Sequence, residues 1–151
     1  MPCIMATEPS PFTLQRLQHV DGALAQHLNA VFDDKTWDAE QGERFLRDPE
    51  NLLVVAFCSD QPCGFVSAHR LQRFDRRGAE VLLYEIGVVE AYRRQGVGTA
   101  LIHEVKRWAR EVGADEVWVL TERTNQAAMA LYRATGGQED SPHTTMFTYA
   151  V

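Results

Sequence analysis

The stretch Tyr92-Arg93-Arg94-Gln95-Gly96-Val97-Gly98-Thr99-Ala100-Leu101 decides how this 151-residue chain is interpreted. It follows the apolar run 79–89 (AEVLLYEIGVV), which is typical of a central strand that is covered on both faces. After it, apolar residues recur at helical spacing, at Val97, Leu101, Val105, Trp108 and Val112. The sequence therefore predicts a glycine-containing turn between a buried strand and the start of a long amphipathic helix.

Gly96 and Gly98 favour the close approach of a ligand to the backbone of this turn. The first N–H groups of a helix have no partner within the helix, so a helix start of this kind can bind a diphosphate. Arg93 and Arg94 would add positive charge there. The segment lacks the Gly-Lys-Ser/Thr ending of a P-loop and the third glycine of a dinucleotide fingerprint. A simple tight turn with two solvated arginines is the alternative that these residues leave open.

The rest of the chain predicts one α/β domain over residues 11–151, preceded by a disordered leader at 1–10 that contains Pro2 and Pro9. A first strand is expected near Phe12, Leu14 and Leu17. Further strands are expected at 51–57, 63–71, 79–89, 116–120 and 146–150, and helices at 20–32, 39–47, 97–112 and 124–135. No repeat, low-complexity tract or linker divides this pattern.

Charge and cysteine content narrow the possible functions. The net charge of −6 disfavours nonspecific nucleic-acid binding and favours cationic ligands. No apolar run approaches the roughly 20 residues that span a bilayer, and residues 1–5 do not resemble a secretory signal. The three cysteines, Cys3, Cys58 and Cys63, are therefore expected to be reduced thiols. We expect a cytoplasmic protein without a nucleic-acid or membrane partner.

Two motifs resemble those of the GNAT superfamily of N-acetyltransferases. Arg93-x-x-Gly96-x-Gly98 is similar to its Arg/Gln-x-x-Gly-x-Gly/Ala signature. Asn125-x-x-Ala128-x-x-Leu131-Tyr132 is similar to its second motif, with Gly136-Gly137 in place of a Gly-Phe ending. The resemblance implies an α/β (α+β) GNAT fold, in which a mixed, mostly antiparallel twisted sheet of six to seven strands is flanked by about four helices. It also implies acetyl-CoA as co-substrate, no metal, and a homodimer as one possible assembly.

The same resemblance assigns the coenzyme to the turn and to the strand before it. The residues implied in binding acetyl-CoA are Ile86, Gly87, Val88, Arg93, Arg94, Gln95, Gly96, Val97, Gly98, Thr99, Asn125 and Tyr132. Gly87 is a candidate position for a bulge that separates this strand from its neighbour. Two alternatives stay open: Asn125 as a simple helix N-cap, and Tyr132 as a packing residue.

Acetyl transfer to an amine requires a neutral nucleophile, a donor to the oxyanion and a proton for the departing thiolate. Glu85 interrupts an apolar strand, and burying an unpaired carboxylate is unfavourable, so Glu85 is either salt-bridged or placed beside a substrate. We identify it as the candidate base, acting directly or through water, or as an anchor for the substrate ammonium. The resemblance implies that Tyr132 protonates the thiolate and that the Val88 amide polarises the thioester carbonyl. Weaker candidates for the base are His69, His103 and His143.

The acidic tract 32–40 (FDDKTWDAE) suits a cationic acceptor, although a charge run is more often a solvated surface. Over about residues 12–150 the chain also resembles the aminoglycoside 3-N-acetyltransferases, with Glu85 at the position of an Asp in their Tyr-Asp-Leu-Ala-Val pattern. This resemblance implies acetylation of the 3-amino group of an aminoglycoside antibiotic. The candidate substrate-binding residues are Asp33, Asp34, Glu85, Glu122 and Asp140, and Trp37 and Phe74 could flank a sugar ring. Acetylation of a polyamine, a protein N-terminus or another metabolite is the alternative, and a non-catalytic acetyl-CoA-binding module is a second one.

Overall fold

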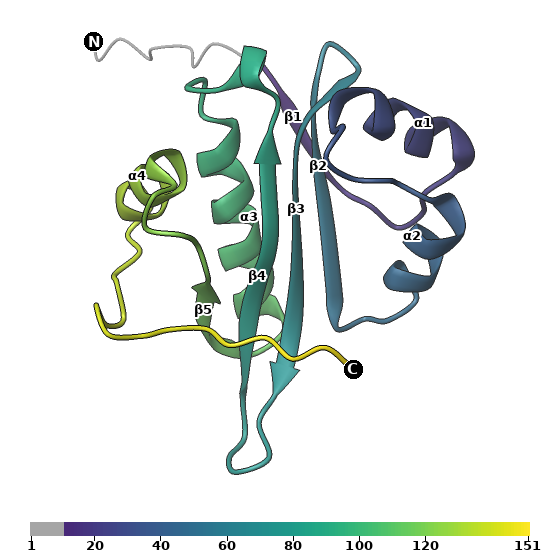
Figure 1. The fold of residues 1–151 in the computed structure, drawn as a ribbon. Coiled ribbons are helices and arrows are strands. Elements are labelled where there is room, and N and C mark those ends of the chain that lie inside the picture. The colour runs from purple at the N-terminus through teal and green to yellow at the C-terminus, as the bar shows by residue number, and fades with distance from the viewer. Residues whose placement is uncertain (1–10) are drawn as a thin grey trace, which may run out of the picture. The chain divides into compact units, whose positions relative to one another are not determined.

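The computed structural model describes residues 11–151, which form two compact units, a first unit up to residue 120 and a second unit at 121–151. In chain order the first unit contains β1 (Thr13–Arg16), α1 (Gly22–Val31), α2 (Ala39–Leu46), β2 (Asn51–Cys58), β3 (Gln61–Gln72), β4 (Ala79–Val88), a 3-10 helix (Glu90–Tyr92), α3 (Val97–Glu111) and β5 (Ala114–Val119). The second unit contains α4 (Gln126–Ala134) (Figure 1). The leader predicted at 1–10 lies outside the described residues, and the single domain over 11–151 stays a prediction.

The first unit is built on one sheet of five strands in the order β1-β2-β3-β4-β5. The pairs from β1 to β4 are antiparallel, and β5 pairs parallel to β4. The turn between β2 and β3 is tight, because Ser59 and Asp60 both have positive φ angles, of 49° and 65°. The predicted mixed and mostly antiparallel sheet is therefore confirmed.

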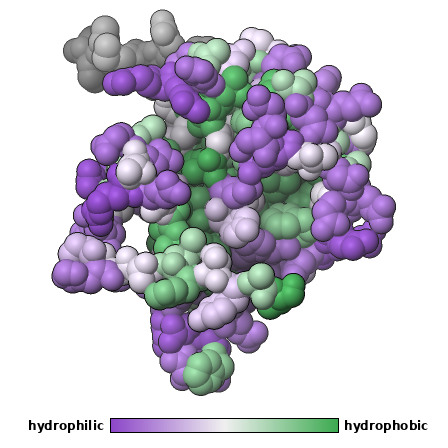
Figure 2. Space-filling model, in the orientation of Figure 1, coloured by the Kyte–Doolittle hydropathy of each residue, from purple (hydrophilic) through white to green (hydrophobic). Residues whose placement is uncertain are grey.

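The two faces of the sheet are covered by different helices. Leu53, Val55 and Phe65 pack in one hydrophobic cluster with residues of α1, and residues of α2 pack against it. Gly64, the neighbour of Phe65, faces the other way, since a Cβ at this position would lie 2.8 Å from the side chain of Val97 on α3. Burial of both faces explains why the central strands are nearly continuous apolar runs. The outer surface of α1 and α2 is mainly hydrophilic (Figure 2).

Acidic side chains cap the starts of α1 and α2, and a glycine turns the chain after α3. Asp21 and Asp38 accept hydrogen bonds of 2.8 Å from the amides of Leu24 and Gln41, at the starts of α1 and α2. Gly113 follows α3 with a φ of 74°, the left-handed conformation in which a glycine commonly ends a helix. The four predicted helices are confirmed, with ends that differ by up to two residues.

The strand predicted at 146–150 is wrong. Residues 138–151 contain no helix or strand, and the side chains of Met146, Phe147 and Tyr149 are exposed. An alternating apolar pattern forms a strand only where a neighbouring strand accepts its backbone hydrogen bonds, and within residues 11–151 nothing pairs with this segment. The sheet consequently has five strands instead of the six to seven expected.

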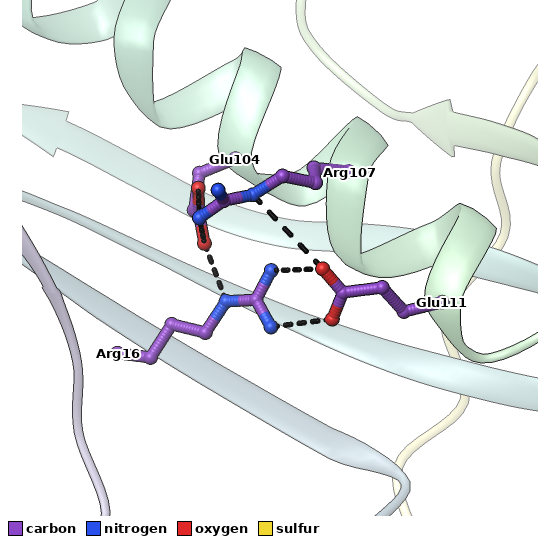
Figure 3. Close-up of polar contacts among 4 residues, drawn as sticks. All are labelled: Arg16, Glu104, Arg107 and Glu111. Atoms are coloured by element: carbon purple, nitrogen blue, oxygen red, sulfur yellow. Dashed lines mark hydrogen bonds and ion pairs between the residues drawn. The ribbon is translucent and has the colours of Figure 1, made fainter.

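An ion-pair cluster joins β1 to α3 (Figure 3). The guanidinium of Arg16 donates to both oxygens of Glu111, at 2.6 and 3.0 Å, and its Nε donates to Glu104. Glu104 also accepts from Arg107, at 2.6 and 2.8 Å, and it is the one buried charged residue within 11–151. Burial alone would raise the pKa of Glu104, but the bonds from Arg107 and Arg16 outweigh it and lower that pKa. The cluster fastens a strand of only four residues to α3.

The thiols of the β2–β3 hairpin are free, as expected. Cys58 and Cys63 are both buried and form no disulfide. Burial, together with a hydrogen bond to Cys58, raises the pKa of Cys63 to about 12. Cys63 is therefore an unreactive packing residue at neutral pH. Cys3 lies outside the described residues.

Candidate active site

The turn at residues 93–99, called the glycine loop below, ends at the exposed start of α3. Gly96 is the N-cap of this helix with a φ of 89°, and no side chain caps the helix. The amide of Ala100 makes the first bond inside the helix, 3.0 Å to the carbonyl of Gly96. The amides of Val97, Gly98 and Thr99 therefore have no partner inside the helix. A Cβ at Gly96 would meet nothing within 4 Å, so both the space and the donors fit a diphosphate.

Side chains of the glycine loop hold its backbone in shape. The Arg93 Nε donates to the carbonyl of Val88 at 3.1 Å, and the Gln95 amide donates to the carbonyl of Ala91 at 3.2 Å. Arg94 has a φ of 60°, which is uncommon for a residue with a side chain. All three side chains are exposed, so the loop keeps the positive charge of both arginines at its surface. The predicted contacts of Arg93, Arg94 and Gln95 with a coenzyme stay predictions.

The end of β4 lacks a strand neighbour on one side. Pairing between β4 and β5 runs from Ala79 opposite Ala114 to Leu83 opposite Val119 and stops there. Residues 85–88 continue to pair with β3 on the other side. Within the described part of the chain, no strand therefore lies beside this edge of residues 84–88. An extended ligand arm could hydrogen-bond to such an edge, which is consistent with the predicted contacts at Ile86 and Val88.

A β-bulge at Tyr84 decides which way Glu85 points. Ser67 pairs with Glu85 and Ala68 pairs with Leu83, so Tyr84 is an extra residue in β4. Regular alternation would place Glu85 on the same face as Leu83. The extra residue moves Glu85 to the opposite face, on the side of Ser67 and of helices α1 and α2.

The prediction of a bulge at Gly87 is therefore wrong, because the bulge lies at Tyr84. Gly87 pairs in regular register with Phe65 of β3. A Cβ at Gly87 would lie 2.7 Å from the Phe65 ring, closer than real contacts allow. Glycine is present here so that this ring can cross over the strand.

A cavity of about 200 Å³, called the acceptor pocket below, lies beside Glu85 on the α1–α2 face. Its aromatic walls are Trp37, Phe45 and Phe65, and its charged residues are Lys35, Asp38 and Glu85. The ring of Phe65 packs edge-on against the ring of Trp37, with 5.1 Å between the centroids. The lining of the pocket therefore combines three aromatic rings with two carboxylates and one lysine.

Glu85 is paired with a primary ammonium group inside this pocket. The Nζ of Lys35 lies 2.7 Å from the Glu85 Oε1, 3.7 Å from the Asp34 carboxylate and 5.9 Å from the centroid of the Phe65 ring. The hydrogen bond to Glu85 raises the pKa of Lys35, so Lys35 stays protonated at neutral pH. Of the two expectations for Glu85, salt bridge or position beside a substrate site, the structure shows the salt bridge, and this bridge lies in a pocket.

The remaining predicted substrate residues are scattered. Asp34 contacts the pocket residue Lys35 by an ion pair but does not line the pocket itself. Asp33 is exposed and does not line the pocket. Phe74 is fully exposed in the turn between β3 and β4, and it does not line the pocket. Glu122 and Asp140 belong to the second unit, and their part in substrate binding stays a prediction.

The second unit carries the residues of the second motif. The Asn125 Oδ1 accepts a bond of 3.1 Å from the Ala128 amide, which confirms the N-cap alternative for Asn125. Tyr132 is half-buried, and this burial raises its pKa. The Gly137 amide donates to the Tyr132 carbonyl at 2.8 Å, after Gly136 with a φ of 89°. The coenzyme contacts predicted for Asn125 and Tyr132 stay predictions.

The histidines lie outside the acceptor pocket. His69 bonds to the Asn51 side chain at 2.7 Å, and its ring packs edge-on against Phe45 and Tyr84. His103 is exposed on α3, and His143 is exposed in the second unit. None of them lines the pocket, so Glu85 is the better candidate for the base.

Sequence reasoning missed Lys35. The residue lies within the acidic tract but received no role, because its partner Glu85 is 50 positions away. The one available signal was rarity, since the chain has only two lysines, Lys35 and Lys106. The pocket wall also contains the indole of Trp37, whose buried Nε1 has no hydrogen-bond partner within residues 11–151.

The model of the Acetyltransferase (GNAT) family matches residues 17–136. The chain belongs to the GNAT acetyltransferase family. Members of this family use acetyl-CoA, and the amides at the start of α3 are donors of the kind that a diphosphate requires. None of the helices within residues 11–151 is long and apolar enough to span a membrane, and no group of three metal-binding side chains occurs there.

This GNAT protein is similar to two curated N-acetyltransferases. It is 31% identical to the N-alpha-acetyltransferase RimI of Mycobacterium tuberculosis, over 89% of this chain and 83% of that protein. It is 28% identical to the [Ribosomal protein bS18]-alanine N-acetyltransferase of Escherichia coli strain K12, over 84% of this chain and 81% of that protein. Among solved structures it resembles an aminoglycoside acetyltransferase from an uncultured soil metagenomic sample, crystallised with sisomicin. That likeness has a TM-score of 0.80 and 22% identity over 93% of this chain and 97% of that chain, and it shows a shared fold.

Proposed function

We propose that this GNAT enzyme acetylates a primary amino group of a polycationic small molecule, specifically the 3-amino group of an aminoglycoside. The observation that carries the proposal is the pair of Glu85 and Lys35, 2.7 Å apart in the acceptor pocket. This pocket already holds a primary ammonium between a carboxylate and an aromatic ring. An amine acceptor would find the same partners there.

Glu85 would bind the substrate as an ammonium ion and then assist its deprotonation. A free alkylammonium has a pKa near 10, so the nitrogen must lose a proton before it attacks the thioester carbonyl. The nitrogen forms the new C–N bond, the C–S bond breaks, and the thiolate takes up a proton. Glu85 is the titratable acceptor for the amine proton on the pocket side of β4, directly or through water.

Exposed carboxylates near the pocket support a polycationic acceptor. Asp33, Asp34, Asp38 and Glu40 are all exposed, and Asp38 lines the pocket. Lys35 is the one basic residue in the segment 33–40. Several negative charges around one opening attract a molecule with several ammonium groups more strongly than a molecule with one. This is the argument for an aminoglycoside over a simple monoamine.

A second candidate is the α-amino group of a protein N-terminus. The similarity to RimI favours it, because that relative is named as an N-alpha-acetyltransferase. The acceptor pocket favours it too, since about 200 Å³ is below the usual range of roughly 300–1,000 Å³ for drug-sized ligands. One amino-terminal residue with a small side chain would fit such a cavity.

An acceptor screen separates the two candidates. The purified chain is mixed with acetyl-CoA and with gentamicin, spermidine or a peptide that begins with alanine, and thiol release is measured. We expect turnover with gentamicin, and NMR of the product should locate the acetyl group on the 3-amino nitrogen. Turnover with the peptide alone would replace our proposal by the second candidate. Coenzyme binding without thiol release from any amine would leave a non-catalytic binding module.

A further inference from the structure

Lys35 occupies the place that the proposed function assigns to the acceptor amine. Its Nζ lies 2.7 Å from Glu85, near the face of Phe65 and at the wall of the acceptor pocket. A substrate ammonium that binds Glu85 would meet the same carboxylate and the same ring. Two ammonium groups cannot occupy the same position beside the Glu85 Oε1 and the Phe65 ring, because like charges repel strongly at contact distance. Substrate binding and the Lys35–Glu85 pair are therefore in competition.

We propose that Lys35 is a built-in competitor for the amine subsite, which the substrate ammonium must displace from Glu85. The inference rests on the proposed function, because it requires that an amine binds at Glu85. It makes Lys35 a residue that sets the affinity for the acceptor without taking part in the chemistry.

The segment that carries Lys35 is fixed at both ends, so its side chain is the part that can move. The Asn29 side chain makes two bonds to the backbone of Trp37, at 2.9 and 2.6 Å. At the other end, the amide of Phe32 donates to the carbonyl of Leu28 at 2.9 Å. Rotation about the side-chain bonds of Lys35 is enough to withdraw its ammonium from the pocket.

Asp34 offers the displaced ammonium a second partner. Its carboxylate already lies 3.7 Å from the Lys35 Nζ, and its side chain is 71% exposed, compared with 40% for Glu85. Lys35 can therefore exchange a partner inside the pocket for one at the surface and keep an ion pair throughout. This second partner lowers the free energy that the substrate must supply for the displacement.

Lys35 is a competitor and not itself an acetyl acceptor. The bond to Glu85 raises the pKa of Lys35, so Lys35 competes for this carboxylate as an ammonium ion. The substrate amine differs from Lys35 in that it is not tethered to a segment held in place by Asn29.

Kinetics of three variants test the proposal. Lys35→Met removes the charge and keeps the length of the side chain, and we expect it to lower the KM for gentamicin about fivefold, the value of one partly exposed ion pair, with kcat within twofold. Lys35→Arg keeps the charge and should keep the wild-type KM or raise it. The matched control is Lys106→Met, which makes the same change at the other lysine, on α3, and should leave both constants unchanged.

A direct readout is NMR of the ammonium groups in lysine-labelled protein, which is simple with two lysines. Adding gentamicin to the wild-type protein should move the Lys35 signal and leave the Lys106 signal in place. A higher KM or a tenfold lower kcat for Lys35→Met would overturn the proposal, because Lys35 would then assist the substrate or the coenzyme. An unmoved Lys35 signal with saturating gentamicin would overturn it too, as would failure of gentamicin to bind. If neither the wild-type protein nor Lys35→Met acetylates any amine, the proposed function fails. The NMR titration then still decides whether gentamicin displaces Lys35 from Glu85.

Discussion

The glycine loop and the acceptor pocket lie in the same unit, but the first is formed by backbone groups and the second by side chains. The glycine loop presents backbone amides at the start of α3, and its shape depends on Gly96. The acceptor pocket is made of side chains from the segment 35–45 and from strands β2, β3 and β4. A backbone site tolerates many changes of side chain around it, whereas a side-chain site changes with each residue. We therefore expect coenzyme binding and the choice of acceptor to vary independently in this fold.

The largest expected effect concerns the acceptor side alone. Glu85→Gln removes the charge that binds and deprotonates the amine, and we expect kcat/KM for the acceptor to fall by about 10³. The dissociation constant of acetyl-CoA, measured by calorimetry, should change less than twofold. The control is Glu80→Gln on the same strand, which loses a bond from Arg73 but does not line the pocket. If Glu85→Gln lost coenzyme affinity and turnover to the same extent, the two sites would not be independent.

The next effect concerns the donor side alone. Gly96→Glu places a side chain and a negative charge at the open N-terminus of α3, and we expect acetyl-CoA to bind about 100-fold more weakly. Gly113→Glu is the matched control, because Gly113 has a similar φ of 74° and equally open surroundings at the other end of α3. Both variants carry the same backbone strain, so only Gly96→Glu should change coenzyme affinity. Unchanged affinity in Gly96→Glu would remove the glycine loop from the coenzyme site.

The glycine loop and the sheet could be predicted because their signals are local. A contiguous motif set the start of α3 at Val97, and apolar periodicity located each of the four helices. The segment 146–150 shows the limit of such signals, since alternation cannot say whether a partner strand exists. The bulge is a second example. Its position at Tyr84 depends on the register with Ser67 and Ala68, which no pattern within β4 contains.

The acceptor pocket could be predicted only in part, because its contacts join distant residues. Glu85 stood out as a carboxylate in an apolar strand, and Trp37 as an aromatic residue in an acidic tract. Lys35, which lines the same pocket, had no signal beyond the rarity of lysine in this chain. Its role arises from the turn after α1, which brings the Lys35 Nζ within 2.7 Å of the Oε1 of Glu85. Glu85 follows 50 residues later, on β4.

A smaller effect is expected from the second unit. Tyr132→Phe removes the hydroxyl that is proposed to protonate the departing thiolate, and we expect kcat to fall about tenfold. The loss is modest because a thiol with a pKa near 8.5 leaves readily as its anion. Tyr149→Phe, an exposed tyrosine of the same unit, is the control. If kcat is unchanged and coenzyme affinity falls, Tyr132 is a binding residue, and the second unit supplies no proton to the reaction.

The smallest effect concerns the helix that carries the glycine loop. Glu104→Gln keeps an acceptor for Arg16 and Arg107 but removes its charge, so the free energy of unfolding at pH 7 should fall by only about 1 kcal/mol. Because the pKa of Glu104 is lowered in the folded protein, its contribution is present above the unfolded value near 4.5 and is lost as the pH falls through the folded value. Urea unfolding should therefore show a gap between wild type and variant at pH 7 that closes between about pH 5 and pH 3.

The variant isolates Glu104 because the other carboxylates are shared by both proteins. The pKa of Glu43 is also lowered, by a bond from the Val20 amide, and Glu43 lies outside the ion-pair cluster, so it contributes equally to both unfolding curves. Glu116→Gln, an exposed change on β5, should leave the curve unchanged at each pH. Coenzyme affinity at pH 7 should match that of wild type, because Glu104 lies about two helical turns from the start of α3, where the donors of the glycine loop lie. A gap that stays constant down to pH 3 would mean that Glu104 acts through packing and not through its charge.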